Sequence, residues 1–465
     1  MSSTRVQSIE VAAETSYCMI AVATGQPSNG ALAVNALEYT TVASLYEGQA
    51  TPSTPREDAR ASPYALPSEP VTMLSGGTPV QRRQGSLTVG GPLRTIGAAD
   101  TAPYGGYTTS GAASAAQATP FGALLSSCMA RADAVTGSRT ETISATAATT
   151  ANTRYLMTGG AGAGSALNEG DLFKIDRTAG GGALQRVECA AVTSEIASGA
   201  DTWVYLTPGM TTDPTTAEVV RRMCTWYPAI GLSGITDAGF VTAAAQIRMH
   251  GGRMAWLNGI VASKFRIFSN GGRVDWEATL DARIIQDADA GAPVNPARME
   301  GAVAHALGAY AVIGSVIDRA TGFPTEQGYA GTLMNLASFD LTFTPTLAFD
   351  SRSDDLAGAA NVEITNWDAE LVVTMTPHST LYTNIRDMFL TQQERNVCIG
   401  FGPVGQGNGG CIWMGAAVPQ GDALISEGEN GRQVVTVTYK PGLWDYDAVG
   451  GVGATDTPLR IGLSY

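Results

Sequence analysis

The length, composition and charge of the chain exclude several classes of protein. At 465 residues the chain exceeds the usual size of one hydrophobic core, so two or three domains are expected. Hydrophobic residues make up 44% and charged residues only 15%, which is typical of a globular protein with a largely uncharged polar surface. The 42 acidic and 28 basic residues give a net charge of -14, which argues against binding nucleic acid through its phosphates, but not against letting it pass.

The cysteines and the N-terminal segment predict a protein made in a reducing compartment. Six cysteines lie at positions 18, 128, 189, 224, 398 and 411, without metal-finger spacing or the density of a disulfide scaffold. We therefore expect free, mostly buried thiols. The N-terminal residues lack the apolar core of a signal peptide, and no apolar stretch is long enough to cross a bilayer. The expectation is a protein that is soluble when made and has no membrane partner.

Short runs with a period of two predict that most regular structure is strand. The expected strands are residues 5–10, 37–45, 84–89, 203–206, 263–268, 274–283, 337–344, 368–375 and 433–439. The clearest hairpin joins residues 263–268 to 274–281, because Asn270, Gly271 and Gly272 supply the positive φ angles of a tight reversal.

Two short helices are also expected. Thr119 can cap the first and Pro120 fits its first turn, and its apolar face holds Phe121, Leu124 and Leu125. The second helix follows Pro377, and its apolar face holds Leu381, Ile385 and Phe389.

The order of these elements suggests an internal duplication. A strand at residues 85–89 precedes the first helix, and a similar strand at 369–373 precedes the second. Three strands follow each helix, at residues 171–175, 185–192 and 203–206 and at 397–401, 411–414 and 434–439. We therefore predict a mainly β fold with two tandem β-sandwich or barrel domains, residues 1–228 and 229–465, each with one short helix and long loops.

Three segments are expected to lie outside the core. Residues 47–79 form a proline-rich arm, which cannot join the interior of a sheet. Residues 159–164 are a Gly-Ala tract, and residues 286–332 mix Gly, Ala and Pro around one possible short helix. In an assembling protein such segments often become ordered against a neighbouring subunit.

No catalytic, metal or cofactor site is expected. The three histidines, His250, His305 and His378, are isolated from one another, and no nucleophile elbow, phosphate-binding loop or calcium loop is present. Carboxylates are plentiful, so spacing alone leaves a glycosidase pair open. We predict a protein that is not an enzyme.

One predicted strand carries a row of acidic and polar side chains. Asp275, Glu277, Thr279 and Asp281 share one face, and the opposite face is apolar. Two interpretations are open: a solvated face of an ordinary half-buried sheet, or part of the lining of a channel.

Several segments resemble tail tube proteins of long-tailed bacteriophages. Pro92-Leu93-Arg94, the small-residue loop at residues 97–103 and the helix at 121–125 resemble one family segment, although residues 104–118 are an insertion. Residues 254–262 and the hairpin at 264–281 resemble a second segment, in which paired strands follow a Gly-rich turn.

The resemblance implies a structural virion protein that assembles into stacked rings around a channel for DNA. The inner sheets of neighbouring subunits would form the ring, helices would lie outside, and loops would join the rings. Two fused domains imply a ring of three chains, and a single domain would imply six. Other implied partners are the tape measure, tail terminator and baseplate proteins. The protein would be made in the host cytoplasm and reside in the virion tail, and DNA would pass without specific binding.

The resemblance also assigns roles to particular residues. The candidate lumen-facing residues are Asp275, Glu277, Thr279 and Asp281. The candidate inter-ring arm contains Pro52, Pro55, Arg56, Pro63, Pro67 and Pro70. The candidate outer helices carry Phe121, Leu124, Leu125, Leu381, Ile385 and Phe389.

Two other functions remain open. One is a different virion component, such as a baseplate ring or capsid surface protein, which would share the β-rich composition. The other is a secreted carbohydrate-binding or carbohydrate-hydrolysing β protein.

Overall fold

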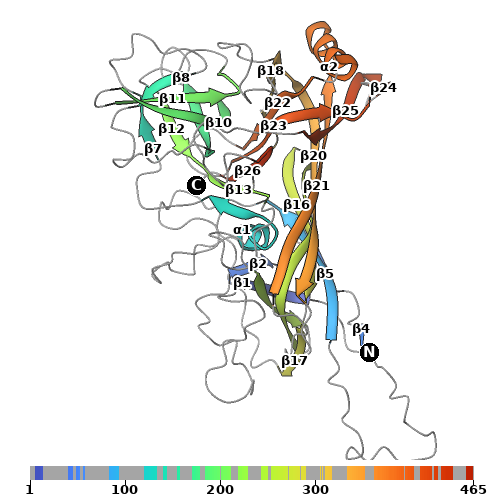
Figure 1. Cartoon of the computed structure of the whole chain (residues 1–465). Helices are drawn as coiled ribbons and strands as arrows, with labels where there is room; N and C mark the ends of the chain where they lie inside the picture. The colour runs from blue at the N-terminus through green and yellow to red at the C-terminus, as the bar shows by residue number, and fades with distance from the viewer. Residues whose placement is uncertain are drawn as a thin grey trace, which may run out of the picture.

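The computed structural model of the chain is mainly β, as the sequence predicted (Figure 1). It describes residues 6–13, 40–44, 49–52, 56–57, 83–93, 120–132, 140–143, 154–157, 170–178, 184–198, 201–210, 218–228, 242–249, 253–270, 272–282, 284–289, 304, 306, 309–316, 332–350, 361–391, 393–402, 409–421, 424–427, 431–442 and 457–463. Within these residues, neither helix is long and apolar enough to span a membrane.

Six antiparallel strands form one extended part of the larger sheet. In spatial order they are β3 (Gln49–Pro52), β5 (Arg83–Pro92), β16 (Arg273–Ala282), β15 (Arg253–Asn270), β20 (Asn335–Asp350) and β21 (Asn361–Thr376). We call these six strands the long sheet. The short strand β4 (Arg56–Glu57) also pairs with β5.

The strands of the long sheet also pair with further strands near both of their ends. Near one end lie α2 (Ser379–Thr391) and the strands β18 (Tyr310–Val316), β19 (Thr332–Leu333), β22 (Arg395–Phe401), β23 (Gly410–Pro419), β24 (Leu424–Glu427), β25 (Gln433–Pro441) and β26 (Leu459–Leu463) (Figure 1). The other half of β15 pairs with β14 (Ala243–Met249) and β17 (Ile284–Asp289). Beyond β14 lie β1 (Val6–Ala13) and β2 (Thr40–Ser44).

A separate six-stranded sheet is inserted between two strands that pair with each other. Its spatial order is β7 (Thr140–Thr142), β12 (Val219–Arg222), β9 (Leu172–Thr178), β10 (Leu184–Ser198), β11 (Asp201–Thr207) and β8 (Arg154–Met157). The chain enters it after β6 (Ala130–Ala132) and returns at β13 (Cys224–Tyr227), and β6 pairs with β13. The chain therefore leaves the larger sheet and rejoins it at two neighbouring strands.

The six-stranded sheet is joined to the larger sheet by a buried contact that we call the seam. Cys189 of β10 packs in one apolar cluster with Cys398 of β22 and Trp413 of β23. The Trp413 indole donates a 2.8 Å hydrogen bond to the carbonyl of Thr207. The buried Arg460 guanidinium lies 4.3 Å from the Trp413 ring centroid and donates to the carbonyl of Gly170 at 3.1 Å. Figure 1 shows the six-stranded sheet beside β22, β23 and β26.

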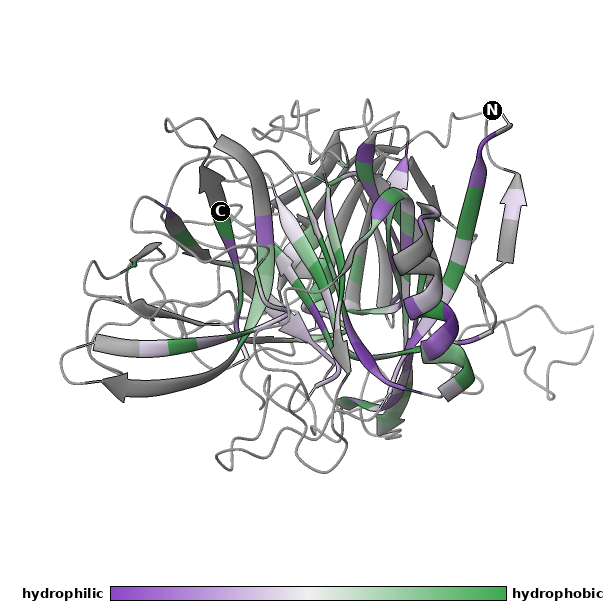
Figure 2. Ribbon diagram, turned by 90° about the horizontal axis from the view of Figure 1, so that it is seen from above, coloured by the Kyte–Doolittle hydropathy of each residue, from purple (hydrophilic) through white to green (hydrophobic). Residues whose placement is uncertain are grey.

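The principal core lies on the apolar face of the long sheet. Phe121 of α1 (Pro120–Leu125) makes edge-to-face contacts with Phe265 of β15 and Trp276 of β16, at centroid distances of 5.1 and 5.5 Å. Phe265 and Trp276 stack on each other at 5.8 Å. Hydrophobic and hydrophilic residues alternate along the strands, so one face of the sheet is apolar (Figure 2).

The predicted strands and helices are confirmed, and the predicted hairpin is formed by β15 and β16. Gly272 has a φ of 87°, which is the left-handed conformation expected at this turn. The prediction that residues 286–332 lie outside the core was wrong for one part, because Tyr310–Val316 forms the buried strand β18. A strand buried on both faces has no polar alternation, so the period of two is not visible there. The Gly-Ala tract at residues 159–164 lies outside the described residues.

The two-domain organisation remains a prediction. The six predicted strands form as β9, β10 and β11 in one sheet and β22, β23 and β25 in another. However, β6, β7 and β8 lie between α1 and β9, and β24 lies between β23 and β25. Strands nevertheless pair across residue 228, because β5 pairs with β16 and β13 pairs with β26. The hydrogen-bonded sheet is therefore continuous across the expected boundary.

Candidate functional site: the polar face of the long sheet

Alternation along β16 creates the polar face of the long sheet. Val274, Trp276, Ala278 and Leu280 are buried in the core, whereas Glu277, Thr279 and Asp281 are partly exposed on the opposite side. The predicted division of this strand into two faces is therefore confirmed.

Asp275 differs from the other three candidate residues because it is buried. Its Oδ2 atom accepts a 2.7 Å hydrogen bond from Asn270 Nδ2, and its Oδ1 atom lies 2.9 Å from Arg273 Nε. Asp275 is only 5% exposed, whereas the Arg273 side chain is 52% exposed. This carboxylate therefore stabilises the hairpin turn and presents little of its surface to solvent.

The strand registers show which residues lie beside the acidic row. Arg266 of β15 lies opposite Glu277 of β16, and Thr342 of β20 lies opposite Arg266 on its other side. Thr342 in turn pairs with Glu370 of β21. Directly paired residues point to the same side of a sheet, so these four side chains form one row across the polar face.

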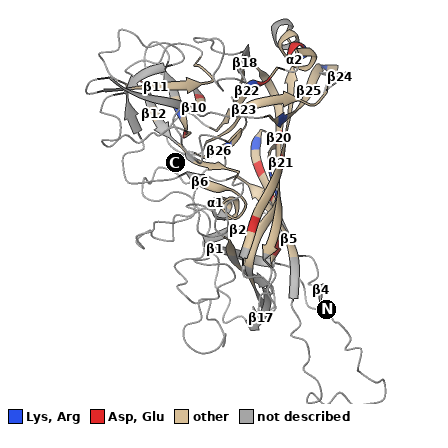
Figure 3. Cartoon of the chain, in the orientation of Figure 1, with Lys and Arg blue, Asp and Glu red and all other residues tan. Residues whose placement is uncertain are grey.

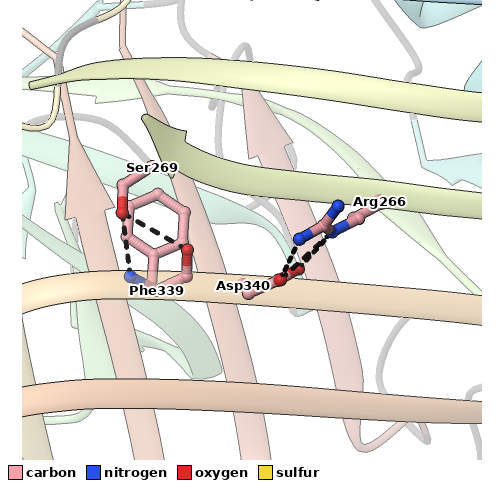
Figure 4. Close-up of polar contacts among 4 residues, drawn as sticks. All are labelled: Arg266, Ser269, Phe339 and Asp340. Atoms are coloured by element: carbon pink, nitrogen blue, oxygen red, sulfur yellow. Dashed lines mark hydrogen bonds and ion pairs between the residues drawn. The ribbon is translucent and has the colours of Figure 1, made fainter. Parts of the chain in front are cut away.

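On this face an ion pair joins the β15–β16 hairpin to the β20–β21 hairpin. Arg266 Nε lies 2.8 Å from Asp340 Oδ1, and Arg266 NH2 lies 2.5 Å from Asp340 Oδ2, so the contact is bidentate (Figure 4). The hydrogen bond and the negative charge of Asp340 raise the pKa of Arg266, with a smaller contribution from Glu277. The guanidinium also lies 4.3 Å from the Phe268 ring centroid. Arg266 is therefore fixed by contacts within its own sheet.

Ser269 holds the same two hairpins together beyond the end of their backbone ladder. Its hydroxyl accepts a 3.0 Å hydrogen bond from the amide of Phe339 and donates to the Phe339 carbonyl at 3.4 Å (Figure 4). The β15–β20 ladder spans only residues 265–268 and 340–343. The side chain therefore replaces the next backbone pair.

A second ion pair lies between β25 and β21. Lys440 Nζ lies 2.9 and 3.0 Å from the two carboxylate oxygens of Asp368. The hydrogen bond to Asp368 and its charge raise the pKa of Lys440. Beside it, the hydroxyls of Thr374 and Thr436 are 3.2 Å apart and share a hydrogen bond.

Acidic side chains outnumber basic ones on the described polar face, which includes β25. The acidic side chains are Asp275, Glu277, Asp281, Asp340, Glu363, Asp368 and Glu370. The basic side chains are Lys264, Arg266, Arg273 and Lys440. Seven minus four leaves a net charge of -3, with three of the four cations paired to a carboxylate. Figure 3 shows both signs interleaved along the long strands.

The described residues of this face hold no candidate metal centre. No group of three or more His, Cys, Asp or Glu side chains within the described ranges could hold a metal ion. The hydroxyls and ion pairs form a broad polar surface.

The other candidate residues lie in three different settings. Phe121, Leu124 and Leu125 are buried in the principal core. Ile385 is buried and Phe389 is partly exposed on α2, while the side chain of Leu381 is outside the described set. The position of either helix in an assembly remains a prediction.

Only part of the candidate arm is described. Pro52 ends β3 and Arg56 begins β4, and both short strands pair with β5. Pro55, Pro63, Pro67 and Pro70 lie outside the described residues. The role of the arm between rings remains a prediction.

Sequence reasoning missed the counterions Asp340, Asp368 and Lys440. The alternation of each strand could have predicted that these three side chains lie on a polar face. It could not have predicted that Asp340 pairs with Arg266, or that Asp368 pairs with Lys440.

Comparison with models of known protein families gave no match for this chain, and a search of curated proteins gave none either. The class that the fold defines is that of mainly β proteins built from antiparallel sheets.

Proposed function

We propose that this chain is a structural, non-enzymatic protein that assembles into the tail tube of a long-tailed bacteriophage. The observation that carries the proposal is the long sheet, which has one face sealed against a core and the other covered by hydroxyls and a net excess of carboxylates. The sequence resemblance to tail tube proteins supports the same function.

The charge of the polar face suits the lining of a DNA channel. Carboxylates repel phosphates, and an isolated cation would attract them. Arg266, Arg273 and Lys440 each have a carboxylate partner within the sheet, so their charges are locally balanced. DNA could therefore pass such a surface without being retained.

The assembly would consist of copies of this chain in stacked rings. A duplicated chain would form threefold rings, and an unduplicated one sixfold rings. Rings that stack head to tail continue to grow until another protein caps them. We propose that the tape measure, tail terminator and baseplate proteins are the further partners in the virion, after synthesis in the host cytoplasm.

Electron microscopy of the purified protein tests this function. We expect hollow tubes with a regular axial repeat, and an averaged cross-section with threefold or sixfold symmetry. Closed shells or isolated rings would indicate another virion component. Glycan binding or hydrolysis by a persistent monomer would indicate a carbohydrate-active protein and contradict the proposal.

A further inference from the structure

We infer that Cys398 and Cys411 form a thiol–disulfide site inside the seam, where hydrogen peroxide oxidises the two thiols to a disulfide. The inference goes beyond the proposed function and does not depend on it, because the site lies within a single chain. Its basis is a cluster of three buried thiols, two from the larger sheet and one from the six-stranded sheet.

The two thiols of the larger sheet lie diagonally across one face of neighbouring strands. Cys398 of β22 is paired with Trp413 of β23, and Gly400 is paired with Cys411. Residues two apart on a strand point to the same face, so the two side chains lie side by side. Their Sγ atoms are 3.5 Å apart. A disulfide needs a separation of about 2.05 Å, so a relative movement of about 1.5 Å closes the bond.

A third thiol reaches the same place from the six-stranded sheet. A Cβ on Gly400 would lie 2.6 Å from Cys189 Sγ, so this sulfur occupies the space that a side chain at position 400 would need. Cys398 Sγ also donates a 3.3 Å hydrogen bond to the Cys189 carbonyl. A neighbouring thiol can attack a disulfide and exchange with one of its sulfurs. A bond from Cys189 to Cys398 or Cys411 is therefore the expected secondary product, and it would join the two sheets covalently.

Burial determines which reagents can reach the site. The three thiols are 0% exposed and pack in one cluster with Tyr310 and Trp413. A bulky disulfide or thiol reagent therefore cannot enter without opening the seam, whereas hydrogen peroxide is only slightly larger than water. Burial also raises the pKa of Cys398 and of Cys411, so few thiolates are present and oxidation is slow. The same packing shields the finished disulfide from bulky thiols.

The oxidation needs only the two thiols and hydrogen peroxide. The first sulfur attacks one peroxide oxygen and breaks the O–O bond, which gives a sulfenic acid and a hydroxide that leaves as water with the thiol proton. The second sulfur attacks the sulfenic sulfur, the S–S bond forms, and the S–O bond breaks. The departing hydroxide takes the second thiol proton as another water. Two thiols thus lose two electrons, and the peroxide is reduced to two waters.

The disulfide would clamp β22 to β23 at the seam. Cys398 and Cys411 are 13 residues apart in the chain, so the bond closes a loop in the unfolded state. Closing such a loop restricts the unfolded chain and stabilises the folded one. Oxidation is therefore expected to strengthen the part of the larger sheet that holds the six-stranded sheet.

Peptide mapping of the full-length protein tests the site. The reduced protein is freed of reductant, incubated with hydrogen peroxide, alkylated in denaturant and digested without reduction for mass spectrometry. Cys128 is the internal control, because it is equally buried but lies in the principal core, where its thiol donates to the Leu125 carbonyl at 3.3 Å. We expect at least about tenfold more linkage between Cys398 and Cys411 than in any pair that contains Cys128, because disulfide formation requires close sulfurs.

The melting temperature gives a second measurement. Peroxide treatment should raise it by several degrees in the wild-type protein and leave it unchanged in Cys411→Ala, which cannot form the bond. If the seam cysteines stay fully alkylated, or if Cys128 is linked as often as they are, the inference is overturned. The wild-type digest decides this even if Cys411→Ala does not fold. Tube formation is observed separately by microscopy, so failure of the disulfide site leaves the proposed function standing.

Discussion

At the scale of single residues, the polar face depends on where each charge finds its partner. Arg266 and Asp340 are each about one-third exposed, so water screens their attraction, but the two parallel hydrogen bonds fix the geometry. Lys440 and Asp368 form a second ion pair, through the single Nζ atom of the lysine, on a more exposed part of the face. These contacts hold strands in register and leave few cations available to an anionic polymer.

Replacing Asp340 by Asn tests the contribution of this contact. We expect Asp340→Asn to lower the free energy of unfolding by about 1 kcal/mol, because a bidentate pair at partial exposure is worth near the upper end of the surface range. Urea unfolding of the unassembled chain at low and high salt measures it. Asp281→Asn is the control, since it removes the same charge from the same face and Asp281 has no ion pair among the described residues. Equal effects of the two substitutions would contradict a specific role for the Arg266 contact.

At the scale of elements, the hairpins and α1 depend on one another. α1 has only six residues, too few to be stable alone, and it is held by aromatic contacts to β15 and β16. The hairpin of β15 and β16 in turn buries its apolar face against α1. Its polar face is held in position by that packing.

Truncation of Phe121 tests this dependence. We expect Phe121→Ala to lower the free energy of unfolding by about 3–5 kcal/mol, because it removes a buried ring that contacts Phe265 and Trp276. Leu390→Ala is the control: Leu390 on α2 is 63% exposed, so its truncation should change stability by less than about 0.5 kcal/mol. Denaturant unfolding followed by tryptophan fluorescence measures both. A small effect at Phe121 would mean that α1 packs only loosely on the sheet.

At the scale of the whole molecule, the seam joins the six-stranded sheet to the larger sheet through buried contacts. Cys398 Sγ donates to the carbonyl of Cys189 at 3.3 Å and lies 3.5 Å from Cys411 Sγ. Gly400 leaves room for this packing, because a Cβ there would lie 2.6 Å from Cys189 Sγ. Burial raises the pKa of Cys398 and of Cys411, since the thiolate form would lose its hydration inside the seam.

The raised pKa values predict that alkaline pH weakens the seam. A thiol whose folded-state pKa lies above its ordinary value of 9.0 stabilises the fold fully below that pH. As pH rises above 9.0, the unfolded chain loses these protons first, so stability falls. We expect the melting temperature to fall as the pH rises above about 9, and to fall less in the Cys398→Ala/Cys411→Ala variant. Thermal unfolding followed by circular dichroism checks this, and parallel pH profiles for the two proteins would contradict it.

The sequence alone determined the features that depend on neighbouring residues. The alternation of Val274 and Trp276 with Glu277 and Thr279 predicted a strand with two faces, because side chains on a strand alternate whatever lies beside it. Asn270 and Gly272 predicted the reversal between β15 and β16 for an equally local reason. The mainly β fold follows from many such segments.

Only the tertiary structure decided which of these segments meet. Arg266 and Asp340 are 74 residues apart, and a shift of β20 by one residue would place Asp340 on the other face of the sheet. The burial of β18 depends in the same way on strands that cover both of its faces. Register and burial are set by packing over the whole chain, so the local sequence pattern does not predict them. The ion pairs therefore emerge only when the sheet is assembled.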